Sequence, residues 1–572
     1  ASWNRLGFRT PLANPALRAV LRRVQEQLPP EWGQTGPDWQ ALSALPSGEA
    51  CVAVVESGSG KPVIVLAMEV RARHEKAAEV LGRLGRGPKA AAQPPAEQSI
   101  AGTRVLQHPG LAYFIKDDLL VAATETETAL EILRSWPGTG GPGTGRMVQS
   151  DLYRAVMRQC RAGAEGVEPQ LRCFVRPIQY LAVRLAAEKR KRPVTAQQYL
   201  DQARQTGFEG IRGVGGAAWL GRDGHALDYR IAVYAPDQNT TAMRVLVMPN
   251  RPSHEPPAWV PGDVAGFGSF SWEMQRAFEP FAELFDLAIA DLADGKTGVF
   301  EEILDALAHD PNGPQIDIRA EFIRRLGNRV LVVSGPEKPS GSVWDRGVFA
   351  FEVTDEAAMA RALNKYCDSA EGASHDGEHK KYEIAGHVVH EFSRGQRRSP
   401  RPKRVVAPLP RVPSLAPKRR GDQSAVDKIP LGPVFVTVAH GHLLWGNNGE
   451  LLKRLLQPGK SSLAADPRYR AVEEELRRTA EGPASFHTFS RTGDDFRLLA
   501  RCMDPEKLYT PFFLEAQEAV AKQSAAPRQP PAKTPEAATS SPGPAGWLAY
   551  TLPDGWRIVG FVLKPASPEQ GQ

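Results

Sequence analysis

The sequence predicts an α+β protein made of two tandem copies of a mostly antiparallel sheet, with helices packed against each sheet and long Pro- and Gly-rich loops. Short landmarks recur in the same order in the two halves of the chain. Strand-like runs follow one another through short turns with few helices between them, which is typical of antiparallel sheets. The 572 residues include 52 Gly and 49 Pro, which favours long irregular connections.

Internal repetition is the strongest of these signals, because it places equivalent residues at matching points of the two halves. The matched pairs are Trp3/Trp272, Ile100/Ile384, Tyr153/Tyr469, Phe174/Phe489 and Gly224/Gly555. Chance matching of short apolar words is the alternative, and the preserved order of the pairs disfavours it. We therefore expect residues 41–236 and 318–565 to share one topology, with the members of each pair on equivalent strands.

Each half contains the same succession of elements. Residues 63–70 and 347–353 are dense in Val, Ile, Leu and Phe, and both predict strands. Residues 75–84 and 356–366 carry apolar residues at helical spacing and predict helices. Asp355 immediately precedes the second of these helices and is its expected N-cap.

The repeat and the proline content divide the chain into three parts. We expect a first α+β copy over residues 1–248, a linker over 249–262 and a second copy over 263–572. The linker contains five prolines, which favours an extended and stiff segment. Within the second copy, residues 394–428 and 524–544 lack apolar periodicity and are expected to be mobile loops.

The net charge of +6 is concentrated in one segment. Residues 394–428 contain eleven Lys or Arg and two Asp, so the rest of the chain is close to neutral. The segment has no aromatic residue, which favours an acidic protein surface, an anionic polymer or an anionic lipid as its partner over a specific nucleic acid. A loop without a partner is the alternative. The candidate contact residues are Arg397, Arg398, Arg401, Lys403, Arg404, Arg411, Lys418, Arg419 and Arg420.

Cysteine usage argues against a disulfide framework and against a zinc knuckle. The chain has five cysteines, an odd number, and no C-x-x-C pair. Cys160 and Cys173 are candidates for one disulfide if the compartment is oxidising. No run approaches the ~18 apolar residues that a membrane helix needs.

The glycine-rich motifs do not predict nucleotide binding. Gly58-Ser59-Gly60-Lys61 resembles the end of a phosphate loop, but Pro62 stands where Ser or Thr is required and a strand follows, so a hairpin turn is favoured. Residues 207–216 lead into a strand and not a helix, so their glycines are expected to serve positive φ angles or close backbone contacts.

Histidines and acids are the remaining candidates for chemistry. His375-Asp376-Gly377-Glu378-His379 groups potential metal ligands, and a solvated loop is the favoured interpretation. His387 and His390 are expected on opposite faces of a strand, whereas His440 and His442 share one face. The paired acids Glu301-Glu302 and the run 473–475 are interpreted as solvated helix faces. The chain has neither a G-x-S-x-G elbow nor an H-E-x-x-H motif, so we predict no catalytic, cofactor or metal residue.

Three longer words resemble a known family. They are Gly207–Gly216 (GFEGIRGVGG), Trp259–Val264 (WVPGDV) and Asp310–Asp317 (DPNGPQID) followed by Leu326-Gly327. The chain is similar over most of its length to a planctomycete-type family of bacterial proteins described as membrane-bound or secreted, with no assigned activity. The resemblance implies a duplicated module and an extracytoplasmic location, and it assigns no functional residue.

These observations favour a non-catalytic structural or interaction protein that belongs to a larger assembly outside the cytoplasm, with protein partners or self-association. Two alternatives stay open. One is a binding module for a small or lipidic ligand between sheet and helices, and the other is a hydrolase with a dispersed site.

The first copy is expected to lack one strand. Residues 263–270 read as a strand that leads into Trp272, whereas Trp3 follows Ala1-Ser2 directly. Since an open sheet edge leaves backbone groups unpaired, we expect an upstream segment with a leader or anchor, or a strand of a neighbouring chain, to fill the position.

Overall fold

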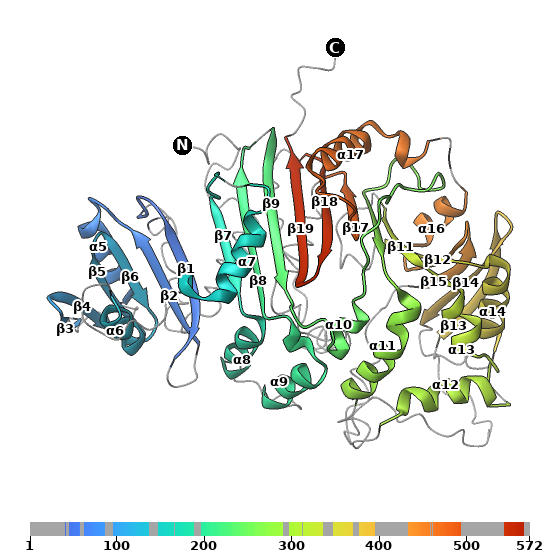
Figure 1. Cartoon of the computed structure of the whole chain (residues 1–572), viewed down its shortest axis with the longest axis horizontal. Coiled ribbons are helices and arrows are strands. Elements are labelled where there is room, and N and C mark those ends of the chain that lie inside the picture. The colour runs from blue at the N-terminus through green and yellow to red at the C-terminus, as the bar shows by residue number, and fades with distance from the viewer. Residues whose placement is uncertain are drawn as a thin grey trace, which may run out of the picture. The chain divides into compact units, whose positions relative to one another are not determined.

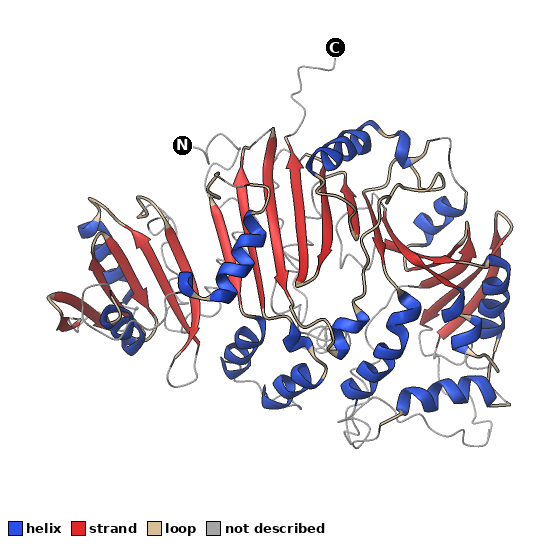
Figure 2. Ribbon diagram, viewed as in Figure 1, coloured by secondary structure: helices blue, strands red, loops and turns tan. Residues whose placement is uncertain are grey.

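The computed structural model of the chain describes residues 41, 45–57, 62–85, 95–136, 147–164, 166–187, 196–222, 224–289, 297–311, 313–335, 347–369, 377–394, 433–457, 459, 461–492 and 543–564. Within these residues the strands form two sheets whose neighbouring strands are all antiparallel, with helices on their faces (Figures 1 and 2). The protein is therefore α+β, as the sequence predicts.

The first sheet has six strands in the order β1-β2-β6-β5-β4-β3. Their bounds are β1 Ala50–Glu56, β2 Pro62–Glu69, β3 Ala96–Ile100, β4 Thr103–His108, β5 Leu111–Lys116 and β6 Leu119–Ala123. Helix α5 (His74–Gly85) packs on one face, where Leu81 and Tyr113 are buried. Helix α6 (Thr126–Arg134) packs on the other face, where Leu133 and Phe114 are buried.

The second sheet has thirteen strands in the order β13-β14-β15-β16-β12-β11-β10-β17-β18-β19-β9-β8-β7. Their bounds are β7 Leu171–Val175, β8 Gly213–Leu220, β9 His225–Tyr234, β10 Gly266–Ser271, β11 Leu326–Ser334, β12 Gly347–Val353, β13 Gly377–Ile384, β14 His387–Arg394, β15 Val434–Ala439, β16 His442–Gly446, β17 Phe486–Ser490, β18 Ala545–Leu552 and β19 Gly555–Leu563. The Asp-Gly turn at 554–555 joins β18 to β19 in the last hairpin.

Further helices connect and cover the strands of the two sheets, and one of them, α8 (Pro177–Ala187), contacts β1 and β2 of the first sheet. Their bounds are α7 Asp151–Arg161, α8 Pro177–Ala187, α9 Ala196–Gln205, α10 Thr241–Val245, α11 Met274–Ile289, α12 Val299–His309, α13 Ile318–Glu321, α14 Glu356–Asp368, α16 Gly449–Leu456 and α17 Pro467–Thr479. Short 3-10 turns occur at Met147–Gln149, Phe208–Gly210, Ile323–Arg325 and Leu463–Ala465.

Alternation along β15 decides which helix covers which face of the second sheet. Phe435 and Ala439 are buried in a core with α16 and α17. Val436 and Val438 pack instead against the α14 cluster around Met359. Because neighbouring residues of a strand point to opposite faces, α14 and α16 cover opposite faces of this part of the sheet.

Both halves of the chain repeat one strand order. The order β1-β2-β6-β5-β4-β3 matches β11-β12-β16-β15-β14-β13, and the hairpin meander β7-β8-β9 matches β17-β18-β19. The turns agree as well: Ala101 and Ala385 have φ angles of 47° and 51°, each followed by a glycine with positive φ. The Ile100/Ile384 pair lies on β3 and β13, and the Phe174/Phe489 pair on β7 and β17, as the duplication predicts.

The chain folds into two compact units. The first consists of residues 1–154 and 176–200, and the second of residues 155–175 and 201–572. Residues 249–262 lie inside the second unit, where Trp259 and Val260 are buried in the core. The predicted boundaries at 248 and 263 describe the duplicated segments of the sequence and not the compact units. They stay a prediction.

Candidate functional site

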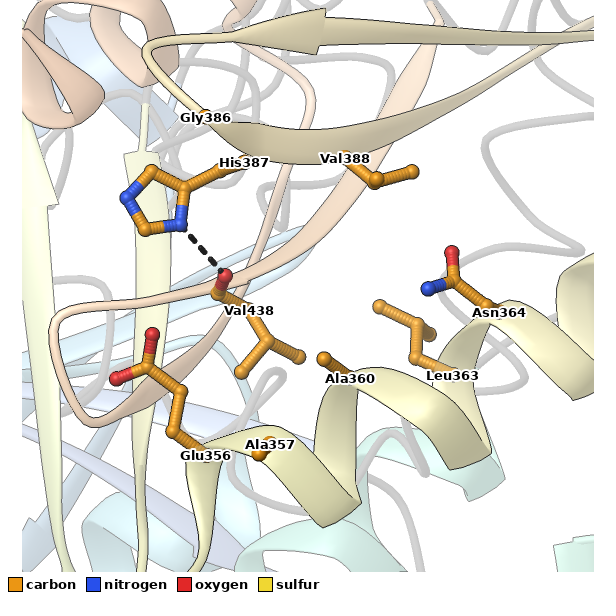
Figure 3. A pocket seen from close by; sticks show the side chains of 9 residues that line it. All are labelled: Glu356, Ala357, Ala360, Leu363, Asn364, Gly386, His387, Val388 and Val438. Carbon is orange, nitrogen blue, oxygen red and sulfur yellow. Dashed lines mark hydrogen bonds between the residues drawn. The ribbon is translucent and has the colours of Figure 1, made fainter.

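A pocket of about 390 Å³ lies between α14 and the strands β14 and β15 of the second unit (Figure 3). Its floor is apolar and is formed by the side chains of Ala357, Ala360, Leu363, Val388 and Val438. Ala357 and Ala360 of α14 line the pocket, and their short side chains leave space that longer side chains would fill. This is the sheet-to-helix position in which the sequence left a ligand-binding alternative open.

Three polar side chains line the rim of the pocket, and each is already hydrogen bonded. Glu356 Oε2 accepts from the backbone N–H of Gly441 at 2.6 Å. His387 Nδ1 lies 3.2 Å from the carbonyl oxygen of Val438, so this nitrogen carries the proton (Figure 3). Asn364 Oδ1 lies 2.8 Å from His390 Nε2. The rim can orient a polar group of a ligand, while the floor suits a small apolar body.

His390 is fully buried and has a hydrogen-bond partner at each ring nitrogen. Its Nε2 faces Asn364 and its Nδ1 lies 3.0 Å from His379 Nε2. Burial, together with the smaller effect of the neighbouring His379, lowers the pKa of His390 to about 4. A neutral imidazole at neutral pH donates at one nitrogen and accepts at the other, which fits this arrangement.

The structure divides the described histidines that the sequence singled out into two groups, His387 with His440 and His442, and His379 with His390. His387 lies beside His440, with ring centroids 5.5 Å apart, while His390 faces α14. His440 and His442 both contact the ring of Trp259, with distances between ring centroids of 5.5 and 5.3 Å. Burial lowers the pKa of both histidines. Across the described ranges, no group of three or more His, Cys, Asp or Glu residues is arranged to hold a metal ion.

Two parts of the predicted candidate set fall elsewhere. The nine basic residues between Arg397 and Arg420, together with His375 and Asp376, lie outside the described residues. The interpretation of 375–379 as a loop is wrong at its end, because β13 begins at Gly377 and pairs with β14. His379 is therefore held against Phe392, with ring centroids 4.7 Å apart.

The interpretation of Glu473 and Glu475 as solvated is also wrong. Glu473 Oε2 lies 2.7 Å from His487 Nε2, and Glu475 Oε1 lies 2.6 Å from His225 Nε2. Burial raises the pKa of each acid, but hydrogen bonds and charges from the histidine and a neighbouring arginine outweigh it, so both pKa values lie below the usual range. The acids fasten α17 to the sheet.

One buried serine–histidine pair was missed by sequence reasoning. Ser269 Oγ lies 3.0 Å from His254 Nδ1, and His254 Nε2 lies 2.8 Å from the carbonyl of Ala484. Arg329 Nε donates to the same hydroxyl at 3.0 Å. Ser269 is 0% exposed, so a substrate has no access to its oxygen. His254, Ser269 and Ala484 come from three separate segments, and no sequence motif predicts their contact.

Aromatic side chains form two adjacent ladder rows across one face of the second sheet. Paired residues of β18, β17, β10, β11, β12 and β16 make up the rows; one contains Trp547, Thr488, Gly268, Val332, Phe349 and Trp445, and the other Ala549, Phe486, Phe270, Val330, Phe351 and Leu443. The Phe270 and Phe486 rings stack at 4.9 Å, and Trp445 is 40% exposed. The rows leave large apolar side chains partly open to solvent.

Strand β1 is the most exposed apolar element of the first unit. Val52, Val54 and Val55 are 51%, 37% and 36% exposed. One side of β1 pairs with β2, and no strand among the described residues pairs with its other side. Residues Ala50–Val55 include no charge and no proline, although these are the usual features that protect an exposed edge.

No family model matches the chain, and no curated protein matches it. Two solved structures of TP0453 are similar to it. Crystal form I has a TM-score of 0.23 and 9% identity over 55% of this chain and 81% of that chain. Crystal form III has a TM-score of 0.22 and 10% identity over 56% of this chain and 83% of that chain. At these TM-scores the likeness carries no argument about fold or role.

None of the helices that the structure describes is long and apolar enough to cross a membrane.

Proposed function

We propose that this chain acts as an extracytoplasmic interaction component of a larger assembly. The observation that carries the proposal is the edge of β1, where three valines between the terminal acids Glu49 and Glu56 are 36% to 51% exposed. Exposed apolar edges aggregate unless another polypeptide covers them, so such an edge fits a protein whose surface is completed by a partner. The resemblance to the planctomycete-type family supports the location outside the cytoplasm.

The size of the native particle tests this function. The chain alone has a mass of 62.3 kDa. We expect gently isolated native protein to form a larger particle of defined composition and to fractionate outside the cytoplasm. Mass photometry and mass spectrometry of the particle give its size and content. A native particle with the mass of a single chain contradicts the proposed function.

A second candidate function is binding of a small, mainly apolar ligand, and the pocket beneath β14 favours it. We expect an environment-sensitive fatty-acid probe to bind the isolated protein and an Ala360→Trp variant to lose at least tenfold in affinity, because indole fills the floor. Val148→Trp is the matched control, since Val148 is 59% exposed and is not among the residues that line the pocket. Equal binding by the two variants contradicts this candidate.

A further inference from the structure

Strand β11 of the second unit is the counterpart of β1, and a further strand pairs with its outer side. β1 is the first strand of the order β1-β2-β6-β5-β4-β3, and β11 is the first strand of the matching order β11-β12-β16-β15-β14-β13. β2 and β12 pair with β6 and β16 in matching registers, through Glu69↔Leu119 and Glu352↔His442. Carried through β2 and β12, this alignment places Ala53 at the position of Val333.

The strand on the outer side of β11 is β10. β10 runs antiparallel to β11, with Phe267 opposite Val333 and Gly268 opposite Val332. Its sequence, GFGSFS, is uncharged and carries two phenylalanines, Phe267 and Phe270, among Gly and Ser residues. Phe267 is 2% exposed in the core beneath α16, so this ring covers the outer flank of β11 on that face.

No strand among the described residues covers the same flank of β1. Ala53 is only partly buried against the core beneath α6, and Val52 on the opposite face is 51% exposed. An added strand with a phenylalanine opposite Ala53 covers the flank of the α6 core, as Phe267 covers the flank of the α16 core. Its neighbouring residue, opposite Val52, is small in the template.

We propose that β1 is a docking edge for an antiparallel strand of a partner protein, about six residues long, uncharged, and composed mainly of Gly or Ser with an aromatic residue opposite Ala53. The inference rests on the proposed function, because it names the partner chemistry of the same edge. Main-chain hydrogen bonds supply the affinity, and the aromatic residue opposite Ala53 supplies the selectivity. The pairing between β10 and β11 fixes the direction and the register.

A synthetic peptide with the sequence of residues 263–271 is the probe. On adding it to the isolated full chain, we expect amide exchange over residues 50–56 to slow at least tenfold and alkylation of the exposed Cys51 to slow as well. A peptide with proline at the position of Gly268 serves as the control, because it lacks one main-chain donor. In the protein, Val52→Lys should abolish peptide binding and Val148→Lys should not, and unchanged exchange over β2 shows that both variants are folded.

Two results with the isolated chain overturn the inference. One is the absence of peptide-dependent protection of β1. The other is slow exchange of β1 in the isolated chain without peptide, since the chain then covers its own edge. In a native particle larger than one chain, fast exchange of β1 also overturns the inference and leaves the proposed function standing. A native single chain that binds the peptide overturns the proposed function and supports the strand chemistry.

Discussion

The buried residue His254 is neutral at neutral pH because burial outweighs the effect of its hydrogen bonds. Burial lowers the pKa of His254 to about 4, although its bond to the Ala484 carbonyl acts in the opposite direction. The protonated form therefore costs free energy in the folded state and not in the unfolded state. This makes His254 a structural residue whose contribution depends on pH.

Stability is expected to fall as the pH drops from about 6.5 to about 4. In that window the unfolded chain protonates residue 254 and the folded chain does not, so acid favours unfolding by at most about 1.4 kcal/mol per pH unit. Above pH 6.5 the contribution is complete. Urea unfolding at several pH values measures it. His254→Gln should flatten the slope in this window, and the exposed His309→Gln should leave it unchanged.

Cysteine reactivity should follow burial. Cys51 is exposed, whereas Cys160 and Cys367 are buried and burial raises the pKa of each thiol to about 12. The thiolate is the reactive form, so we expect iodoacetamide to label Cys160 and Cys367 at least tenfold more slowly than Cys51. Peptide mass spectrometry reads each site. All sites should react alike in concentrated guanidinium, and fast labelling of Cys160 in native protein contradicts its burial.

At the scale of elements, each copy packs a helix closely against a strand at a glycine of that strand. Helix α7 lies on β8 at Gly215, where an added Cβ would come within 2.6 Å of Met157 Cε. Helix α17 lies on β18 at Gly546, where an added Cβ would come within 2.6 Å of Val472 Cγ1. In both places the absence of a side chain brings the helix close to the sheet.

Adding a methyl group at either glycine should therefore destabilise the fold. We expect Gly215→Ala and Gly546→Ala each to lower the free energy of unfolding by about 1–3 kcal/mol, since a packed core resists overfilling. Chemical denaturation measures the loss. Gly459→Ala is the control, because its added methyl meets nothing within 4 Å and should change stability by less than about 0.5 kcal/mol. Equal effects at all three positions count against close helix seating.

At the scale of the second unit, the meanders β7-β8-β9 and β17-β18-β19 join through the antiparallel pair β9 and β19. The helices of each copy reach across this junction. Gln159 of α7 donates to Asp554 in the β18–β19 turn at 3.0 Å, and Glu475 of α17 binds His225 at the start of β9. These reciprocal contacts fix how the two meanders meet.

The charged contact is expected to matter most. His225→Ala or Glu475→Gln should each cost about 1–3 kcal/mol of unfolding free energy, because the remaining group stays buried with fewer partners. A double-mutant cycle measures their coupling. The exposed pair Arg244 and Glu283 is the control and should couple by less than about 1 kcal/mol. Independent effects of His225 and Glu475 contradict their role at the junction.

Local sequence determined the elements of this protein. The apolar run at 347–353 predicted β12 with the same bounds, and helical spacing from Glu356 predicted α14. Asp355 caps that helix as expected, accepting from the Ala358 N–H at 2.9 Å. These predictions succeed because periodicity and capping depend on residues within a few positions of one another. The repeated landmarks extended them to a common topology for both halves.

Only the tertiary structure decided how the strands are shared between sheets and which polar groups meet. Sequence predicted one sheet for each copy, yet β7, β8 and β9 of the first half complete the sheet of the second. Nothing local to Glu475 predicted His225, and nothing near Ser269 predicted its bond to His254 against the remote Ala484 carbonyl. Such contacts join segments up to hundreds of residues apart. These contacts depend on which apolar faces pack together. The sequence of one strand does not specify the strand or helix that packs against it.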